Sequence, residues 1–152
     1  MGRELLRPSD RFHLVGVIDP DANAAATLLT VWVNAGLYES FCAFISAGDL
    51  GTNATLDAKL RQATDSSGTS AKDITGKSIT QLTQAGTDKS NKQAFINLES
   101  EDLDIANGFS WVALSVTGAI ATSDFAAYLF AFNARYQDAA HISSVIEEVG
   151  GQ

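Results

Sequence analysis

The chain has 152 residues, 45% of them hydrophobic and 18% charged, with ten basic and eighteen acidic side chains and a formal net charge of −8. A chain of this length and apolar content can form one domain with a real core, so global disorder is excluded. Duplex binding requires clustered Lys and Arg, and the acidic balance therefore argues against nucleic acid and anionic membrane as partners.

The first half of the chain contains four segments typical of β-strands. A strand is expected at 12–18. Residues 27–33 are rich in β-branched and aromatic side chains and end at a turn, so they are expected to pair with 38–46 as a hairpin or meander. Residues 55–63 alternate with a period of two, which predicts a strand with one charged, wet face and one apolar face formed by Leu56, Ala58 and Leu60.

The second half repeats this style. Strands are expected at 93–98, 109–117 and 125–132. One short helix is expected at 78–85, where Ile79 and Leu82 have a spacing of three. The core is expected to contain the following residues: Val31, Leu56, Leu60, Trp111, Val112, Leu114, Val116 and Phe130.

The polar segment 65–69 has the composition of a hairpin tip. Asp65 is expected to accept hydrogen bonds from the backbone that follows it, and Gly68 is expected to adopt a positive φ. Short strands joined by such turns, with few windows of helical period, predict an all-β fold.

The predicted architecture is a single-domain antiparallel β-sandwich of jelly-roll type, with extended N- and C-terminal arms. The expected division is an N-terminal arm at 1–11, the sandwich at 12–138 and a C-terminal arm at 139–152. The sequence shows no apolar leader and no apolar run near the ~20 residues of a membrane span. The protein is therefore expected to be made in a cytoplasm.

Two segments invite a reading as reactive or nucleotide-binding sites. Cys42 is the only cysteine, and its apolar surroundings favour a small buried hydrophobe over a nucleophile. Gly76, Lys77 and Ser78 match the end of a phosphate-binding loop, but Ala71 stands where that motif requires glycine. We therefore interpret 76–78 as a polar loop.

Four acidic residues form the densest candidate for metal or acid–base chemistry: Glu99, Glu101, Asp102 and Asp104. Such carboxylates can bind calcium or act as an acid–base pair. However, Leu103 and Ile105 between them have the pattern of the apolar side of an edge segment. A solvated edge, which also discourages unwanted strand pairing, is the favoured interpretation.

No other constellation of catalytic residues is visible. His13 and His141 are isolated in the sequence, and no serine lies in a Gly-x-Ser-x-Gly elbow. Trp32 and Trp111 are expected in the core rather than on a sugar-binding platform. The sequence predicts no catalytic residue, no cofactor and no metal ligand, so the protein is not expected to be an enzyme.

Residues 56–80 resemble a family of small structural proteins of tailed bacteriophages and prophages. The resemblance continues through 97–98 and 101–104 to Phe109, Val112 and 114–116, and ends at 134–136. It covers roughly residues 30–138 and supplies no catalytic residue. Genes of this family commonly lie among the head genes, near the gene for the major capsid protein.

The resemblance implies a virion structural role, most plausibly decoration or cementing of the capsid exterior. The implied partners are the major capsid protein and further copies of the chain, with the capsid surface as the location. Two alternatives stay open: another virion component, such as a vertex spike, head–tail connector or tail protein, and a module that binds a host surface or glycan.

Overall fold

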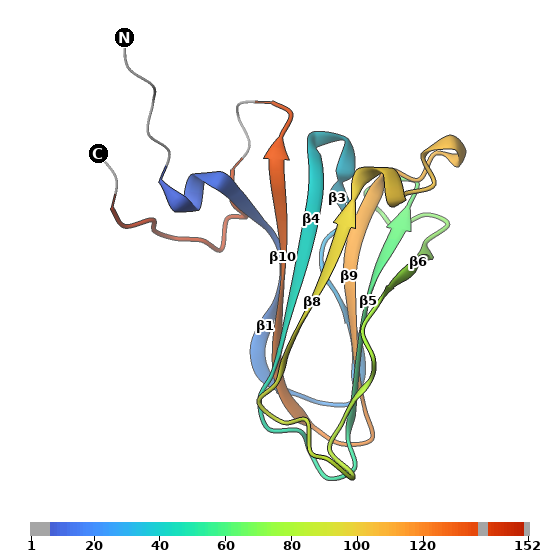
Figure 1. Ribbon diagram of the computed structural model, residues 1–152, viewed down its shortest axis with the longest axis vertical. Coiled ribbons are helices and arrows are strands. Elements are labelled where there is room, and N and C mark those ends of the chain that lie inside the picture. Colours follow the sequence, from blue (N-terminus) through green and yellow to red (C-terminus); the bar gives the residue numbers. More distant parts are fainter. Residues whose placement is uncertain (1–6, 137–139, 151–152) are drawn as a thin grey trace.

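The protein is a sandwich of two antiparallel β-sheets (Figure 1). The structure is a computed structural model and describes residues 7–136 and 140–150. The first sheet has the strand order β1 (Phe12–Asn23), β10 (Ser123–Ala134), β4 (Tyr38–Ala47), β8 (Gln93–Glu99). The second has the order β2 (Ala26–Leu29), β9 (Trp111–Ala119), β5 (Thr55–Ala63), β6 (Lys72–Ser78).

Short elements complete the chain. β3 (Val33–Asn34) pairs with β9, and β7 (Leu82–Thr83) pairs with β5. No α-helix occurs in the described part of the chain, whose helical turns are of the 3₁₀ type: η1 (Pro8–Arg11), η2 (Ala35–Leu37), η3 (Ser100–Asp102) and η4 (Ile105–Asn107).

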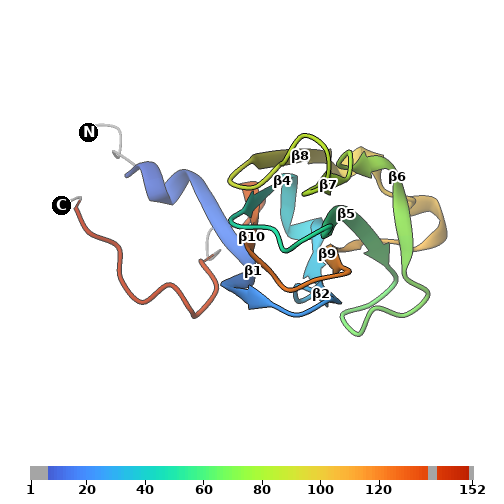
Figure 2. The ribbon, with the colours of Figure 1, turned by 90° about the horizontal axis from the view of Figure 1, so that it is seen from below.

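The strand order is that of a jelly roll. Most connections cross from one sheet to the other, so each sheet is built from strands far apart in the sequence, as two Greek keys require. The predicted all-β antiparallel sandwich is therefore confirmed. Figure 2 shows the two layers end-on, with β1 at the edge of the first sheet.

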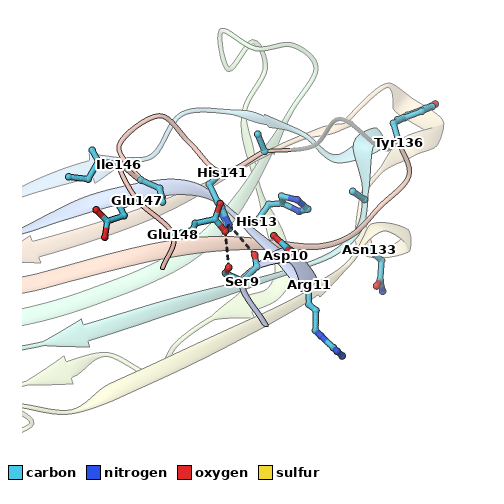
Figure 3. A pocket seen from close by; sticks show the side chains of 13 residues that line it. Ser9, Asp10, Arg11, His13, Asn133, Tyr136, His141, Ile146, Glu147 and Glu148 are labelled. Atoms are coloured by element: carbon cyan, nitrogen blue, oxygen red, sulfur yellow. Dashed lines mark hydrogen bonds and ion pairs between the residues drawn. The ribbon is translucent and has the colours of Figure 1, made fainter. Parts of the chain in front are cut away.

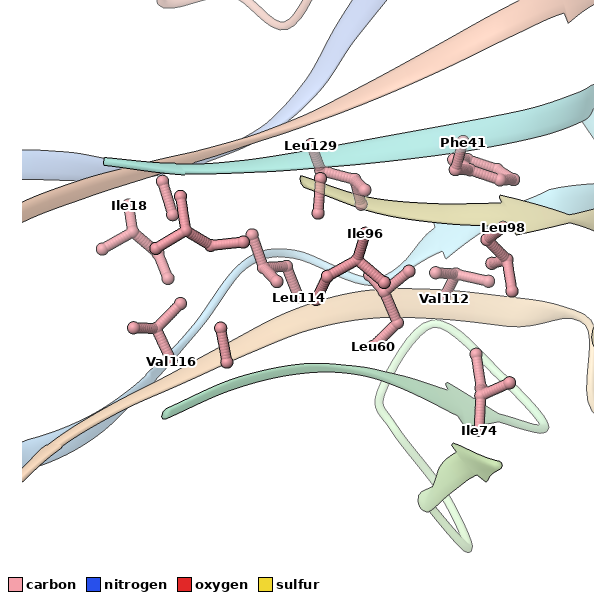
Figure 4. Packing of buried hydrophobic residues seen from close by; sticks show 14 of the residues in the cluster. Ile18, Phe41, Leu60, Ile74, Ile96, Leu98, Val112, Leu114, Val116 and Leu129 are labelled. Atoms are coloured by element: carbon pink, nitrogen blue, oxygen red, sulfur yellow. The ribbon is translucent and has the colours of Figure 1, made fainter. Parts of the chain in front are cut away.

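The core lies between the sheets (Figure 4), where side chains of β4, β8 and β10 meet those of β5 and β9. Leu60 and Leu114 are register partners on neighbouring strands, and both are fully buried. In Figure 4 their side chains face Leu129 and Ile96 of the opposite sheet. The core prediction is confirmed for these residues: Leu56, Leu60, Val112, Leu114 and Val116.

The other three predicted core residues lie elsewhere. Val31 is 58% exposed. Trp111 is only half-buried, at the start of β9. Phe130 is half-buried and faces outward, because Leu129 and Ala131 take the inward positions of β10.

The expected strand at 27–33 is interrupted, and its pairing with 38–46 is wrong. β2 ends at Leu29 and β3 begins at Val33, and both pair with β9, whereas β4 lies in the other sheet between β10 and β8. The interruption turns Thr30 inward, where its hydroxyl accepts a hydrogen bond from the Leu114 N–H at 2.9 Å. This inward turn is what leaves Val31 in solvent.

The expected helix at 78–85 is also wrong. The chain there is extended, with β7 paired to Thr55 and Leu56 of β5. The expected polar loop at 76–78 is instead the end of edge strand β6, in which Gly76 adopts a φ of 78°. A helix of this length is only marginally stable in water, whereas the paired β7 is held by the sheet.

The turn at 65–69 has the predicted structure. The Asp65 carboxylate accepts hydrogen bonds from the N–H groups of Ser67 and Thr69 at 2.9 and 3.1 Å, and Gly68 has a φ of 80°. These bonds, led by those involving Thr69, lower the pKa of Asp65. A Cβ at Gly68 would lie 2.5 Å from Nε1 of Trp32, so any side chain at residue 68 would clash with this indole.

Ile120 is held in a strained turn between β9 and β10. Its φ is 76°, and the Ala121 N–H donates to the Ala119 carbonyl at 2.9 Å, which defines a γ-turn that β-branched residues rarely adopt. Its side chain is 69% exposed. Ile120→Gly should therefore raise the free energy of unfolding by about 1 kcal/mol in chemical denaturation. Ile105→Gly, at an exposed position outside the positive-φ region, should not; equal effects would contradict the assigned strain.

Candidate interaction site

The outer face of the first sheet carries a row of aromatic side chains. Alternation along β10 points Tyr128, Phe130 and Phe132 outward, and register pairing places Phe44 of β4 beside Tyr128. Phe95 of β8 pairs with Phe44 and is 66% exposed. We call this the aromatic face, defined by Phe12, Phe44, Phe95, Tyr128, Phe130 and Phe132.

No charged side chain interrupts the aromatic face. The outward positions between its rings hold small or neutral residues: Leu14, Val17, Ser40, Cys42, Ser46, Gln93, Asn97 and Ala126. Charge begins toward the ends, with Glu99 paired to Ser40, Asp124 paired to Ala22, and Asp19 exposed on β1 after the inward Ile18. Burial raises the pKa of the Cys42 thiol, which keeps it protonated and a poor nucleophile.

The second sheet has the opposite character. On its outer face, Asp73 of β6 pairs with Lys59 Nζ at 3.0 Å and with Arg61 Nε at 2.9 Å. The hydrogen bond from Lys59 is the main reason why the pKa of Asp73 is lowered. One sheet is therefore suited to water and the other to an apolar partner, since contiguous exposed apolar surface marks interaction sites.

Part of the aromatic face is stacked, around Phe44. Phe44 and Phe95 have centroids 5.2 Å apart and an interplanar angle of 29°. Phe44 and Tyr128 are 6.3 Å apart at 17°. Phe12 and Phe130 instead meet edge to face, with centroids 5.3 Å apart and an interplanar angle of 86°. The face therefore combines stacked and edge-to-face rings, the two arrangements that aromatic side chains prefer when they pack.

The described ends of the chain meet at the free edge of β1. Residues 7–11, the N-terminal segment, and residues 140–150, the C-terminal segment, lie together beyond β1 on the side away from the second sheet (Figures 1 and 2). The Ile142 N–H donates to the Leu14 carbonyl at 2.7 Å. The predicted arms thus include a docked pair of segments; residues 1–6, 137–139 and 151–152 lie outside the described part.

His141 fastens the C-terminal segment (Figure 3). Its Nδ1 accepts a hydrogen bond from the Leu14 N–H at 2.9 Å, which leaves Nε2 to carry the proton and donate to the Ser9 carbonyl at 3.0 Å. The ring also lies 5.5 Å from that of His13. The two histidines, isolated in the sequence, are therefore neighbours in the fold.

Glu148 is the second anchor. It accepts a hydrogen bond from the Ser9 hydroxyl at 2.7 Å and lies 3.7 Å from the Arg7 guanidinium and 3.4 Å from His141 Nε2. The Ser9 hydroxyl, followed by the positive charge of Arg7, lowers the pKa of Glu148. Arg7 also pairs with Asp10 at 2.9 Å, and its hydrogen bond lowers the pKa of that carboxyl.

A cavity of about 920 Å³ lies between the docked segments and the end of β10. Ser9, His13, His141 and Glu148 line it, together with Tyr136 (Figure 3). The polar atoms of Ser9, His141 and Glu148 are committed to bonds between the segments. These bonds join the N-terminal and C-terminal segments across the cavity.

Acid should release the C-terminal segment. A lowered pKa means that Glu148 stabilises the docked state fully above its ordinary value of 4.5, and that this contribution is lost as the pH falls through the lower folded value. Relative to the intrinsic rate at each pH, amide exchange of Ile142 should therefore be strongly protected at neutral pH and weakly protected at roughly pH 3. Glu148→Gln should accelerate this exchange at neutral pH, and protection that is unchanged by both acid and substitution would contradict the assignment.

The acidic cluster forms a loop rather than the expected edge segment. Glu101 and Asp102 lie in η3, and Glu99 and Asp104 are the residues before η3 and η4. Leu103 is buried and Ile105 is 54% exposed. The carboxylates bind within the chain: Asp102 lies 3.4 Å from Lys77 Nζ, and Asp104 lies 2.6 Å from Lys72 Nζ. The Lys72 hydrogen bond is the first cause of the lowered pKa of Asp104.

Among residues 7–136 and 140–150, no three His, Cys, Asp or Glu side chains are grouped closely enough to hold a metal ion. No helix within the described ranges has the length and apolar character needed to span a bilayer. Trp32 and Trp111, expected in the core, are both half-buried, and Tyr136 is 66% exposed.

Comparisons with known proteins give a similarity of fold. No family model matches the chain, and no curated protein matches it significantly. A chain of the cryo-EM structure of broad bean stain virus aligns with a TM-score of 0.40 and 14% identity, covering 77% of this chain and 62% of the viral one. A chain of the cowpea mosaic virus empty particle aligns with a TM-score of 0.40 and 12% identity, covering 98% and 92%.

Proposed function

We propose that the protein is a non-enzymatic structural component of a virion, and specifically a decoration or cement protein on the head of a tailed bacteriophage. The observation that carries this proposal is the aromatic face: six rings and no charge at its centre, on a chain of net charge −8. Exposing such a face to water is unfavourable, and a protein surface of matching shape would cover it.

Further features support the same role. Jelly rolls recur among viral capsid proteins, although the fold also serves lectins and cupins. The resemblance over roughly residues 30–138 is to tailed-phage structural proteins. The acidity of the chain would keep it off packaged DNA. The partners under this proposal are the major capsid protein and further copies of this chain, with the capsid exterior as the location.

Binding to capsids tests the proposal. The ligand is a capsid assembled from the major capsid protein of the same genome, without the decorating chain. Phe44→Ser together with Phe95→Ser should weaken binding at least about tenfold in a co-sedimentation titration, because aromatic residues at the centre of an interface typically contribute more than about 1.4 kcal/mol each.

Ile105→Ser is the matched control, since Ile105 is 54% exposed but lies in η4, outside the aromatic face. It should bind as the unmodified chain does. Unchanged binding of the double variant would refute docking through the aromatic face, and failure of the unmodified chain to bind any capsid would refute the decoration role.

The glycan-binding alternative has less support. Tyr136 is exposed, as that alternative requires, but Trp32 and Trp111 are half-buried. Roles as a vertex spike, connector or tail protein share the same protein-binding surface. A cryo-EM map of the source particle would distinguish them by position.

A further inference from the structure

The C-terminal segment is docked by polar contacts and by the half-buried Ile142 and Val145, while two further apolar side chains stay in solvent. His141 and Glu148 face Ser9 and Leu14, whereas Ile146 is 94% exposed and Val149 is 85% exposed. Figure 3 shows Ile146 directed away from the cluster around His141. Docking within one molecule therefore leaves Ile146 and Val149 unburied, although their burial would help to hold the segment.

The receiving surface belongs to the other end of the chain. The hydrogen bonds and ion pairs that join the C-terminal segment to the rest of the described chain go to Arg7, Ser9 and Leu14. The receiving side carries Arg7 and Arg11 together with Asp10, and the segment carries Glu147 and Glu148, of which Glu148 lies 3.7 Å from the Arg7 guanidinium. Any copy of the chain presents the same receiving surface, so a second copy can provide every one of these contacts.

The connection limits where that second copy can lie. Five residues, 135–139, join the end of β10 to the segment, and an extended chain of this length reaches at most about 20 Å. The neighbouring β1 edge must therefore lie against this edge of the sandwich. Two copies that meet at equivalent edges can exchange segments reciprocally across a two-fold axis.

We propose that the C-terminal segment is an exchanged arm: residues 140–150 of one copy dock on the β1 edge and N-terminal segment of a second copy, which covers Ile146 and Val149. This inference deepens the proposed function, because it rests on the self-association of a decoration protein and names the contact between copies. Exchange conserves the polar bonds of the single molecule and adds apolar burial, so the added burial drives the association.

Chemical cross-linking in solution tests the exchange without a capsid. All chains carry Cys42→Ser, which removes the only native thiol. A tagged chain with Ser9→Cys is co-expressed with an untagged chain with Glu148→Cys, and the purified mixture is treated with a short bifunctional maleimide. These side chains touch in the docked state, so arm exchange should give a covalent dimer of one tagged and one untagged chain.

Two controls define the outcome. A tagged Ser9→Cys chain co-expressed with an Ile105→Cys chain should give no dimer. A single chain carrying both Ser9→Cys and Glu148→Cys reports docking within one molecule. Cross-linking only within that chain, or no cross-linking in either preparation, would overturn the exchange. Because no capsid is present, a chain that cross-links but fails to bind capsids would refute only the decoration role.

Discussion

Replacing Leu60 by alanine should lower the free energy of unfolding by about 2–5 kcal/mol, the usual range for truncating a fully buried leucine. Leu60 lies at the centre of β5, has no exposed surface and pairs with the equally buried Leu114. Its side chain projects into the space between the sheets, toward Ile96 of the opposite layer (Figure 4). The close-packed sandwich cannot collapse around the missing atoms without moving a whole strand.

Urea denaturation followed by tryptophan fluorescence would measure this loss. Leu29→Ala is the control, because Leu29 also lies on a strand of the second sheet but is 46% exposed. It should cost well under half as much. Similar losses for the two variants would mean that β5 does not present Leu60 to the core.

The register of β5 was predictable because its two faces differ in chemistry. Charged residues alternate with Leu56, Ala58 and Leu60, so only one assignment buries the apolar set. The turn after β5 was predictable for a local reason, since Asp65 and Gly68 determine its backbone within five residues.

The inward and outward faces of β10 could not be predicted, for the opposite reason. Its sequence is apolar at nearly every position, so alternation could not distinguish the inward Leu129 from the outward Phe130. Large aromatic residues are expected in cores, and here they form the aromatic face instead. A strand that is apolar on both faces was itself the available signal that the outer face of this sheet would also be apolar.

The fastening at the β1 edge could not be predicted from the sequence. His13 and His141 lie near opposite ends of the chain, and only the jelly-roll topology brings β1 and β10 together as neighbours. Non-local pairing of this kind depends on which strands become adjacent, and no local pattern around either histidine encodes that. Pairing of Lys72 and Lys77 with the acidic loop was hidden for the same reason, because β6 itself was not expected.

The aromatic face and the C-terminal segment suit a protein that holds neighbours together. The face lies on the first sheet, and the segment emerges at the β1 edge of that same sheet (Figure 2). Under the proposed function, the aromatic face would lie on the capsid and the segment would contact a second copy. Both surfaces are separate from the charged outer face of the second sheet.

Replacing Gly51 by alanine should lower the free energy of unfolding by about 3 kcal/mol or more, the upper part of the range for overpacking. A Cβ at Gly51 would lie 2.4 Å from the Thr122 carbonyl oxygen and 2.7 Å from Ala121 Cβ. The obstacle is mainly backbone, so no side-chain rotation can relieve it. The Gly51 N–H also donates to the Ser123 hydroxyl at 3.0 Å, a bond that any displacement would break.

The effect should extend beyond residue 51, because neighbouring backbone bonds hold the same two loops together. Gly48 donates to the Asp124 carbonyl at 2.7 Å, and Asp124 donates to the Asp49 carbonyl at 2.9 Å. Gly118→Ala is the matched control, since a Cβ there meets only the Phe125 ring at an ordinary 3.8 Å. Thermal melts of both variants measure the difference, with a large drop in Tm expected for Gly51→Ala and a small change for Gly118→Ala. Equal melting temperatures would show that the loop before β5 is free to move away from the β9–β10 turn.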